Sequence, residues 1–164
     1  MALAELELNE DSVMWDVGAG SGSLAIEAAQ IARGGKVYAI EMDAEDYALM
    51  LENAKLFDVP SLVPIHGQAP EAWETLDNPS AIFVGGSGRM VPDLVAESLQ
   101  RIQNGRIVVN VSSPDNLVAV QAVLENAGVP TDVRMINIAR GMYQLDRVRF
   151  DSLNPTFLVV GQIG

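Results

Sequence analysis

Short runs of apolar, mostly β-branched residues alternate along the chain with stretches in which apolar positions recur at the spacing of a helix. Near-continuous apolar runs are typical of strands that are covered on both faces of a sheet. The strands predicted in this way are Val13–Val17, Lys36–Glu41, Leu62–His66, Ala81–Val84 and Ile107–Val111. The helices predicted between them are Gly22–Ala32, Glu45–Phe57, Pro92–Gln103 and Pro114–Ala127, with a shorter turn at Pro70–Thr75. Alternation of this kind predicts an α/β fold with a Rossmann-like, doubly wound sheet and right-handed crossovers.

The alternation ends after Val129. Two long β-rich runs follow, Val133–Tyr143 and Thr156–Gln162, with no helix-length pattern between them. Two strands joined by a short link pair antiparallel, so we expect one of them to be inserted beside an otherwise parallel neighbour. The result is a seven-stranded sheet, mostly parallel, with an antiparallel last strand. No internal repeat or linker interrupts the pattern, so we expect a single domain over residues 1–164.

The amino-acid composition excludes several kinds of catalytic and metal site. The chain has 164 residues, no cysteine and one histidine, His66. These counts exclude a disulfide scaffold, a thiolate nucleophile and an iron–sulfur cluster, and they disfavour a multi-histidine metal site, so we expect no metal. The longest stretch without a charged residue, Ser152–Gly164, is shorter than the roughly 18 residues that span a bilayer. No basic-then-apolar leader opens the sequence, so we expect a soluble cytoplasmic protein with no membrane partner.

Charge is unevenly distributed. The net charge of −12 argues against nucleic acid as a partner, because phosphate backbones require a cationic stripe. Residues 1–60 carry 12 acidic and 3 basic side chains, whereas residues 134–164 carry 2 acidic and 4 basic ones. Solubility is the simplest explanation of an acidic surface. The alternative is that the acidic residues 1–60 bind a cationic ligand and the basic residues 134–164 bind an anionic one.

A glycine-rich turn follows the first predicted strand. Gly18, Gly20 and Gly22 stand between that strand and the first helix, where glycine permits a tight turn and close approach of a ligand. The dinucleotide pattern G-x-G-x-x-G requires a glycine at position 23, where this chain has Ser23. Asp16, two residues before the first glycine, is expected to face the crevice and suits a ligand that carries an ammonium and a sulfonium.

A second carboxylate closes the second predicted strand. Glu41 can accept hydrogen bonds from both hydroxyls of a ribose that lies along the sheet. The competing structural interpretation is a helix-capping Asp16 and an exposed Glu41.

Asp16, the three glycines and Glu41 together resemble the class I S-adenosylmethionine-dependent methyltransferases. The resemblance covers essentially the whole chain, and it implies that the region Gly18–Gly22 packs against the methionine and ribose of the cofactor. It implies that Glu41 binds the ribose and that the end of the third strand contacts the adenine. The cofactor-binding residues expected from it are Asp16, Gly18, Ala19, Gly20, Ser21, Gly22, Glu41, Met42, Gln68, Ala69 and Gly85. His66 is interpreted as a packed residue and not as a base.

Three further motifs narrow the resemblance. His66-Gly67-Gln68-Ala69-Pro70-Glu71, Val84-Gly85-Gly86-Ser87-Gly88 and Asn137-Ile138-Ala139-Arg140-Gly141 resemble those of the decarboxylating precorrin and cobalt-precorrin methyltransferases, which act on C15 in cobalamin biosynthesis. This family includes the C15-methylating half of precorrin-6Y C5,15-methyltransferase. The resemblance implies a precorrin substrate, a homo-oligomer (a tetramer) and a C5-methylating partner domain. The expected substrate-binding residues are Gly86, Ser87, Gly88, Arg140 and Arg147. Ser87 and Tyr143 are candidates for the proton donor.

Two alternatives stay open at this stage. The chain reaches its first strand by Val13, whereas family members have a longer N-terminal segment that closes over the cofactor. The domain is therefore expected to lack that lid, and a cofactor-binding fragment that is inactive without its N-terminal segment or a partner domain is one alternative. The other is a class I methyltransferase for a different small anionic substrate.

Overall fold

The computed structural model describes residues 1–85, 88, 90–144 and 147–164. The helices are α1 (Ala2–Glu5), α2 (Ser23–Ile31), α3 (Ala44–Phe57), α4 (Val91–Ser98) and α5 (Pro114–Asn126), with a 3-10 turn, η1 (Glu71–Trp73). The strands are β1 (Val13–Val17), β2 (Lys36–Glu41), β3 (Leu62–His66), β4 (Ala81–Val84), β5 (Gly105–Val111), β6 (Thr131–Ile136), β7 (Ala139–Gln144), β8 (Arg147–Ser152) and β9 (Thr156–Ile163). The first four strands have the bounds that the hydrophobic pattern predicts, and β5 begins two residues earlier.

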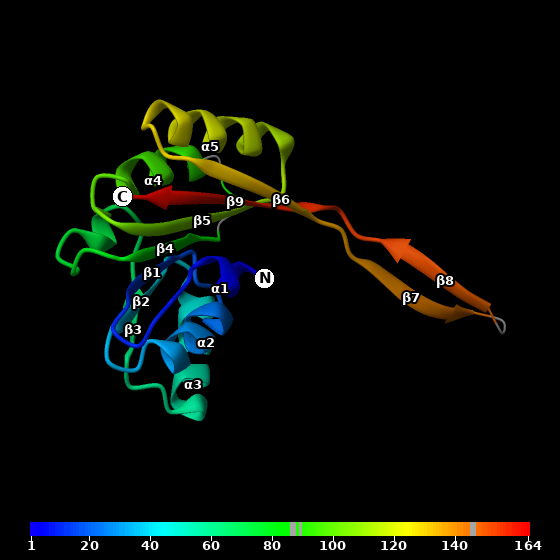
Figure 1. Cartoon of the computed structure of the whole chain (residues 1–164). Helices are drawn as coiled ribbons and strands as arrows, with labels where there is room; N and C mark the ends of the chain where they lie inside the picture. The colour runs from blue at the N-terminus through cyan, green and yellow to red at the C-terminus, as the bar shows by residue number, and fades with distance from the viewer. Residues whose placement is uncertain (86–87, 89, 145–146) are drawn as a thin grey trace.

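Seven strands form one sheet in the order β3-β2-β1-β4-β5-β9-β6 (Figure 1). The pairs β3–β2, β2–β1, β1–β4 and β4–β5 are parallel, and β9 is antiparallel to both of its neighbours, β5 and β6. The prediction of an antiparallel last strand inserted into a mostly parallel sheet is confirmed. The strand order reverses beside β1, between β2 and β4, and crevices of this kind are where doubly wound sheets bind ligands.

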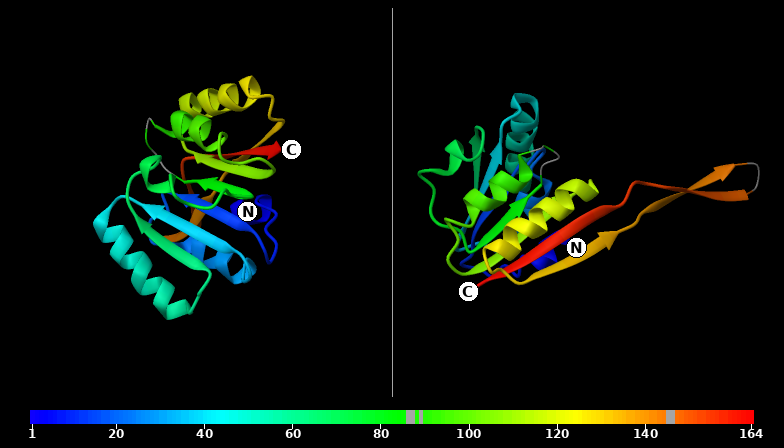
Figure 2. Two further views of the ribbon diagram at one scale, coloured as in Figure 1. Left: turned by 90° about the vertical axis from the view of Figure 1, so that its left-hand side faces the viewer. Right: turned by 90° about the horizontal axis from the view of Figure 1, so that it is seen from above.

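Helices cover both faces of the sheet (Figure 2). Helices α2 and α3 pack on one face, where Met14, Ala28 and Met50 belong to one apolar cluster. Helices α4 and α5 pack on the other face, where Trp15, Val95 and Leu124 belong to a second. Met14 and Trp15 are adjacent and both fully buried, because successive side chains of a strand point to opposite faces. This burial on both faces explains why the parallel strands have nearly continuous apolar sequences.

Helix α4 is shorter than its prediction. The pattern predicted a helix over Pro92–Gln103, whereas α4 ends at Ser98 and turns continue to Arg101. The hydroxyl of Ser98 donates to the carbonyl of Val95 at 2.8 Å, and competition of this kind with the helical backbone weakens a helix end. The short turn predicted over Pro70–Thr75 is present as η1.

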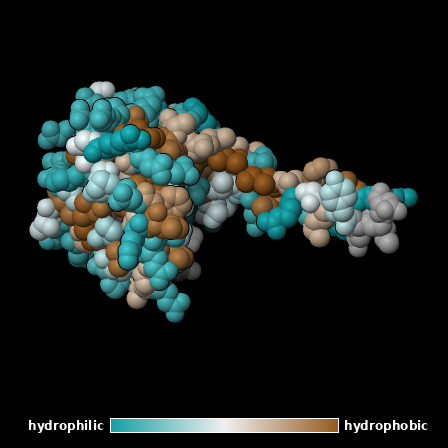
Figure 3. Space-filling model, turned by 90° about the horizontal axis from the view of Figure 1, so that it is seen from below, coloured by the Kyte–Doolittle hydropathy of each residue, from teal (hydrophilic) through white to brown (hydrophobic). Residues whose placement is uncertain are grey.

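The end of the chain differs most from the prediction. The run Val133–Tyr143 is not one strand, because β6 ends at Ile136 and β7 begins at Ala139. The segment that was expected to be a link contains β8, which pairs antiparallel with β7 from Ala139 opposite Ser152 to Gln144 opposite Arg147. We call this two-stranded sheet, residues 139–144 and 147–152, the arm. It projects from the body of the molecule as a continuation of β6 and β9 (Figures 1 and 2), and the space-filling view shows it standing clear of the body (Figure 3).

No helix within the part of the chain that the structure describes is both long and apolar enough to cross a bilayer.

Candidate cofactor site and active site

The turn between β1 and α2 has a backbone that favours glycine. Gly18, Gly20 and Gly22 have φ of 78°, 55° and 78°, in the left-handed region that other residues enter at a cost. A Cβ on Gly22 would lie 2.7 Å from Cγ of Met50 in α3, so this glycine also permits close helix packing. A Cβ on Gly20 would meet no atom within 4 Å. The turn is therefore packed tightly at Gly22 and open at Gly20.

Backbone hydrogen bonds fasten this turn to the end of β2. The N–H groups of Gly18 and Ala19 donate to the carbonyl of Ile40 at 3.0 and 3.1 Å. The N–H of Gly20 donates to Oε2 of Glu41 at 2.8 Å, and the N–H of Asp43 donates to Oε1 at 2.8 Å. The Glu41 side chain is thus fixed at both oxygens, and each oxygen keeps a lone pair for a ligand hydroxyl.

Asp16 is fully buried beneath the turn. It lies on the same face of β1 as Met14, two residues earlier, and neither carboxylate oxygen has a hydrogen-bond partner among the described residues. Burial raises the pKa of Asp16 to about 7; the Ala25 backbone N–H lowers the pKa, and the neighbouring Glu41 carboxylate raises it. We expected Asp16 to face the crevice, but the structure does not place it on the wall of the cavity described next.

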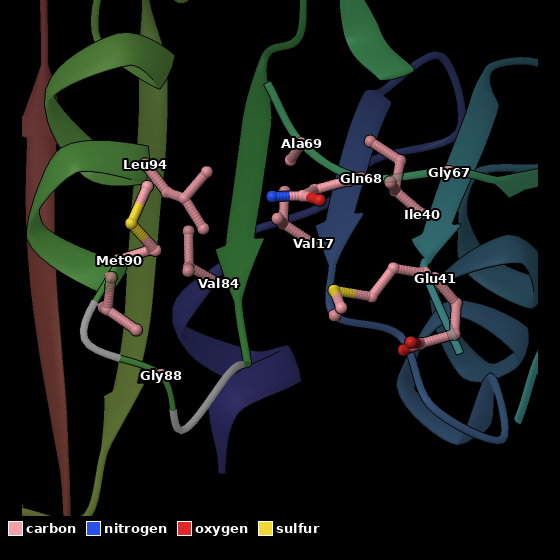
Figure 4. A pocket seen from close by; sticks show the side chains of 13 residues that line it. Val17, Ile40, Glu41, Gly67, Gln68, Ala69, Val84, Gly88, Met90 and Leu94 are labelled. Atoms are coloured by element: carbon pink, nitrogen blue, oxygen red, sulfur yellow. The ribbon is translucent and has the colours of Figure 1, made fainter. Parts of the chain in front are cut away.

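A cavity of about 480 Å³ opens at the carboxyl ends of β1, β2 and β4 (Figure 4). Glu41 is the charged residue among the described side chains of its wall, and Gln68 contributes an amide. The remaining wall is mostly apolar and includes Leu94 and Met90 from the start of α4 on the opposite side. Its lining residues are Val17, Gly18, Ile40, Glu41, Met42, Gly67, Gln68, Ala69, Val84, Gly88, Met90, Val91 and Leu94.

These features fit a nucleoside that carries a short charged chain. The buried carboxylate of Glu41 suits a vicinal diol, and the apolar wall beyond it suits a flat heterocycle. The open space at Gly20 leaves room for a group against the backbone of the turn. The residues present thus fit S-adenosylmethionine.

Most of the predicted cofactor residues lie at this end of the sheet. Gly18, Glu41, Met42, Gln68 and Ala69 line the cavity, and Met42 is 67% exposed at its rim. Ala19, Gly20, Ser21 and Gly22 form the adjoining turn. Gly85 lies against that turn, because a Cβ on it would be 3.5 Å from the carbonyl oxygen of Gly18.

The predicted substrate residues are divided between two places. Gly88 lines the cavity, whereas Gly86 and Ser87 lie outside the described residues. Arg140 and Tyr143 lie on β7 and Arg147 begins β8, so the fold does not bring them to the cavity wall of their own chain. Tyr143, a candidate proton donor, is 89% exposed on the arm, so it is not a core residue of its own chain.

Helix α4 supplies a part of the wall that sequence reasoning missed. Met90, Val91 and Leu94 were not selected, although the spacing of Val91 and Leu94 places both on one helix face near the glycine-rich loop. His66 is exposed and stacks on Tyr47, with ring centroids 4.8 Å apart, which agrees with a packing role. Among the described residues no group of three or more His, Cys, Asp or Glu side chains is placed to hold a metal ion.

The sheet order, the glycine turn and the acid at the tip of β2 define a class I S-adenosylmethionine-dependent methyltransferase. The fold agrees with the solved structure of a SAM-dependent O-methyltransferase from Thermotoga maritima, with a TM-score of 0.78 and 15% sequence identity. The match covers 99% of this chain and 63% of that one. The chain belongs to the precorrin methyltransferase family, because the model of the precorrin methyltransferase domain matches residues 1–150.

The names of individual relatives agree with this family assignment. The chain is 34% identical, over 97% of its length and 83% of the relative, to "Probable cobalt-precorrin-6B C(15)-methyltransferase (decarboxylating)" of Pyrobaculum calidifontis. It is similar to the crystal structure of precorrin-6y C5,15-methyltransferase from Geobacter metallireducens, with 31% identity, a TM-score of 0.90, and coverage of 98% of this chain and 86% of that one. A precorrin 8w decarboxylase from Methanobacterium thermoautotrophicum is 25% identical, with a TM-score of 0.88 over 98% and 87% of the chains.

Proposed function

We propose that this chain is an S-adenosylmethionine-dependent C-methyltransferase of cobalamin biosynthesis. It methylates a precorrin at C15 and removes the carboxylate of the ring-C acetate as carbon dioxide. The observation that carries this proposal is the likeness, over 97% of the chain, to a relative named as the decarboxylating C15-methyltransferase. The cavity at the end of β1 and β2 supports it, because its residues fit the methyl donor.

S-adenosylmethionine supplies an electrophilic methyl group on a sulfonium when it is bound. The chain's own residues orient and shield that group. Glu41 accepts hydrogen bonds from the ribose hydroxyls, and the turn at Gly18–Gly22 holds the amino-acid end against its backbone. Val84, Leu94 and other apolar wall residues exclude water. In-line transfer requires the acceptor carbon to be held at attack distance, which alone lowers the barrier by several kcal/mol.

The second half of the reaction places few demands on the protein. A precorrin meso carbon is electron-rich, and the conjugated macrocycle accepts the electron pair that is left when the carbon–carboxylate bond breaks. One proton then takes the place of the lost carboxylate, so that the acetate side chain becomes a methyl group. A protein base is therefore not required for either step. This agrees with a cavity whose described wall contains one carboxylate and no histidine.

The alternative that we retain is a class I methyltransferase for another small anionic substrate. Methyl transfer without decarboxylation distinguishes the two. The relatives include proteins named for precorrin and for cobalt-precorrin substrates. The same assay, run with both acceptors, determines whether the acceptor carries cobalt.

We also propose that the chain works as a homo-oligomer, with a tetramer as the expected size. The support is the arm, whose apolar side chains include Tyr143 and Phe150, 89% and 69% exposed. A C5-methylating partner domain, a need for a further N-terminal segment and a cytoplasmic location all stay predictions.

The test is the stoichiometry of the reaction. The protein is incubated with S-adenosylmethionine and an acceptor whose ring-C acetate is intact. The acceptor is a precorrin in one reaction and a cobalt-precorrin in a parallel one. We expect S-adenosylhomocysteine and carbon dioxide in equal amounts. S-adenosylhomocysteine without carbon dioxide would favour the alternative substrate, and neither product would contradict the proposed activity of this chain.

A further inference from the structure

The two faces of the arm differ in chemistry. Residues opposite one another in an antiparallel pair point to the same face. Arg140 is opposite Asp151, Met142 is opposite Arg149, and Arg147 stands on the same face two residues before Arg149. Three arginines and one aspartate therefore share this side, which we call the basic face.

The opposite face of the arm is apolar. Gly141 is opposite Phe150 and Tyr143 is opposite Val148. A Cβ on Gly141 would lie 3.5 Å from Cε1 of Phe150, so the ring lies over the glycine. Phe150 and Val148 are nonetheless 69% and 50% exposed. An isolated two-stranded sheet is at best marginally stable in water, so the arm requires a surface that covers it.

A second copy of this chain has the complementary charge. The body of the molecule is strongly acidic, with 12 acidic and 3 basic side chains in residues 1–60 alone. The surplus of positive charge is confined to the last segment, which contains the arm. A basic arm is therefore attracted to the acidic body of another copy and steered toward it.

The arm begins at the end of the sheet where the cavity opens. Val111, the last residue of β5, is opposite Phe157 in β9, and Ile136, the last of β6, is opposite Thr156. The arm thus extends past the carboxyl ends of the parallel strands (Figure 1). Six residues per strand give it a length of roughly 20 Å. When two arms pair about a two-fold axis, the tip of each lies beside the base of the other, at the cavity end of the second copy.

The described wall of the cavity is poor in positive charge. Among the described residues of its wall there is no lysine or arginine, and the one charged group is the Glu41 carboxylate. A precorrin carries many acetate and propionate groups, and arginine binds carboxylates in a bidentate manner. We propose that the basic face of the arm of one copy completes the acceptor side of the cavity in a second copy. Arg140 and Arg147 then bind substrate carboxylates across the interface, whereas Arg149 already pairs with Asp151, with 2.9 Å between Nε and Oδ1. This inference rests on the proposed function, because it requires a polycarboxylate acceptor.

Complementation between two defective variants tests it. Glu41→Ala disables the cavity and leaves the arm intact, whereas Arg140→Ala/Arg147→Ala disables the arm and leaves the cavity intact. The two variants are co-expressed in equal amounts and purified together. If each active site combines the cavity of one copy with the arm of another, roughly a quarter of the sites in a random mixture are intact. We expect about a quarter of wild-type activity from the mixture and less than a tenth from each variant alone.

Binding of a porphyrin octacarboxylate provides a readout that does not depend on turnover. We expect the arm variant to bind this probe at least tenfold more weakly while its affinity for S-adenosylhomocysteine stays within twofold of the wild type. The matched control is Arg33→Ala/Lys55→Ala, which removes two exposed positive charges from the body and is expected to bind both ligands as the wild type does.

The two proposals fail in different ways. A wild-type protein that binds the porphyrin but releases no carbon dioxide from precorrins contradicts the proposed function, and the porphyrin affinity of the arm variant then still decides the inference. A mixture with no more activity than its components, or an arm variant with wild-type porphyrin affinity, overturns the inference. A wild-type protein with no affinity for the porphyrin overturns it as well.

Discussion

The carboxylate of Glu41 and the backbone N–H of Gly20 form a 2.8 Å hydrogen bond that joins the end of β2 to the turn after β1. The residue best suited to bind a ribose therefore also holds the glycine turn in place. Ligand binding and the shape of the turn depend on one side chain, and loss of its charge affects both.

Replacement of this carboxylate is the first prediction. Glu41→Gln removes the acceptor oxygen for either the Gly20 or the Asp43 N–H and the charge that strengthens a bond to a ribose hydroxyl. We expect at least tenfold weaker binding of S-adenosylhomocysteine, which corresponds to about 1.4 kcal/mol. Titration calorimetry measures the affinity. Glu45→Gln, an exposed residue of α3, is the control and should bind normally. Equal affinities of the two variants would contradict the assigned role.

Two glycines of the turn are expected to respond differently to the same substitution. Gly20→Ala costs about 1–2 kcal/mol for its positive φ, because its Cβ meets no neighbour. Gly22→Ala adds the contact of its Cβ with Cγ of Met50, 2.7 Å away, and should cost more in the free energy of unfolding. Urea denaturation measures both. A Gly20 variant that is as unstable as the Gly22 variant would show that the turn is not open at Gly20.

Asp16 gives the folded protein a specific dependence on pH. Its pKa rises on folding from 3.8 to about 7, chiefly because the carboxyl is buried, so the folded state binds this proton more tightly. Stability contributed by this group is greatest below about pH 4, falls as the pH rises toward about 7, and is constant above that. The total change is on the order of a few kcal/mol.

Asp16→Asn removes that titration. We expect the unfolding free energy of the wild type to fall, relative to that of the variant, between about pH 4 and pH 7 in denaturant titrations. Asp46→Asn, at an exposed position in α3, serves as the control and should keep the wild-type pH dependence. The same slope for wild type and Asp16→Asn would mean that Asp16 is not the titrating group.

Arg101 holds the segment from Trp73 to Leu76, which comes after Gln68 in the chain. Its guanidinium donates to the carbonyls of Trp73 at 3.0 Å and Leu76 at 2.8 Å. The Arg101 guanidinium carbon also lies 5.0 Å from the ring centroid of Trp15, and the Trp15 ring stacks on that of Trp73. Lysine cannot reproduce this fork of donors, so we expect Arg101→Lys to destabilise the fold by about 2 kcal/mol. Thermal unfolding with near-ultraviolet circular dichroism detects both the loss and the altered tryptophan pair. An unchanged midpoint would contradict the assigned role.

The sequence predicted the parallel part of the sheet well, for a physical reason. Strands that are buried on both faces must be apolar at nearly every position, and Met14 and Trp15 illustrate this by packing into different clusters. The three glycines of the turn were equally visible in the sequence, because few other residue types permit their backbone angles. Glu41 lies at the predicted end of β2, and its contact with a ribose stays a prediction.

The arm was harder to predict. Arg147, Val148, Arg149 and Phe150 alternate strictly between polar and apolar, which is the signature of a strand with one exposed face. We interpreted the segment as a link because no helix-length pattern lies between the two β-rich runs. The strand β8 is mostly exposed, so it lacks the continuous apolar run that marks the strands of the main sheet. Asp16 is buried and neither of its carboxylate oxygens has a partner among the described residues, so its expected contact with the cofactor stays a prediction.

Hydrogen–deuterium exchange with and without saturating S-adenosylhomocysteine tests the location of the cofactor site most directly. We expect one molecule bound per chain and slower exchange in the peptides that contain Gly18–Gly22 and Glu41–Met42, which form the turn and the rim of the cavity. Absence of saturable binding, or protection confined to segments remote from the carboxyl ends of β1 and β2, would contradict the account.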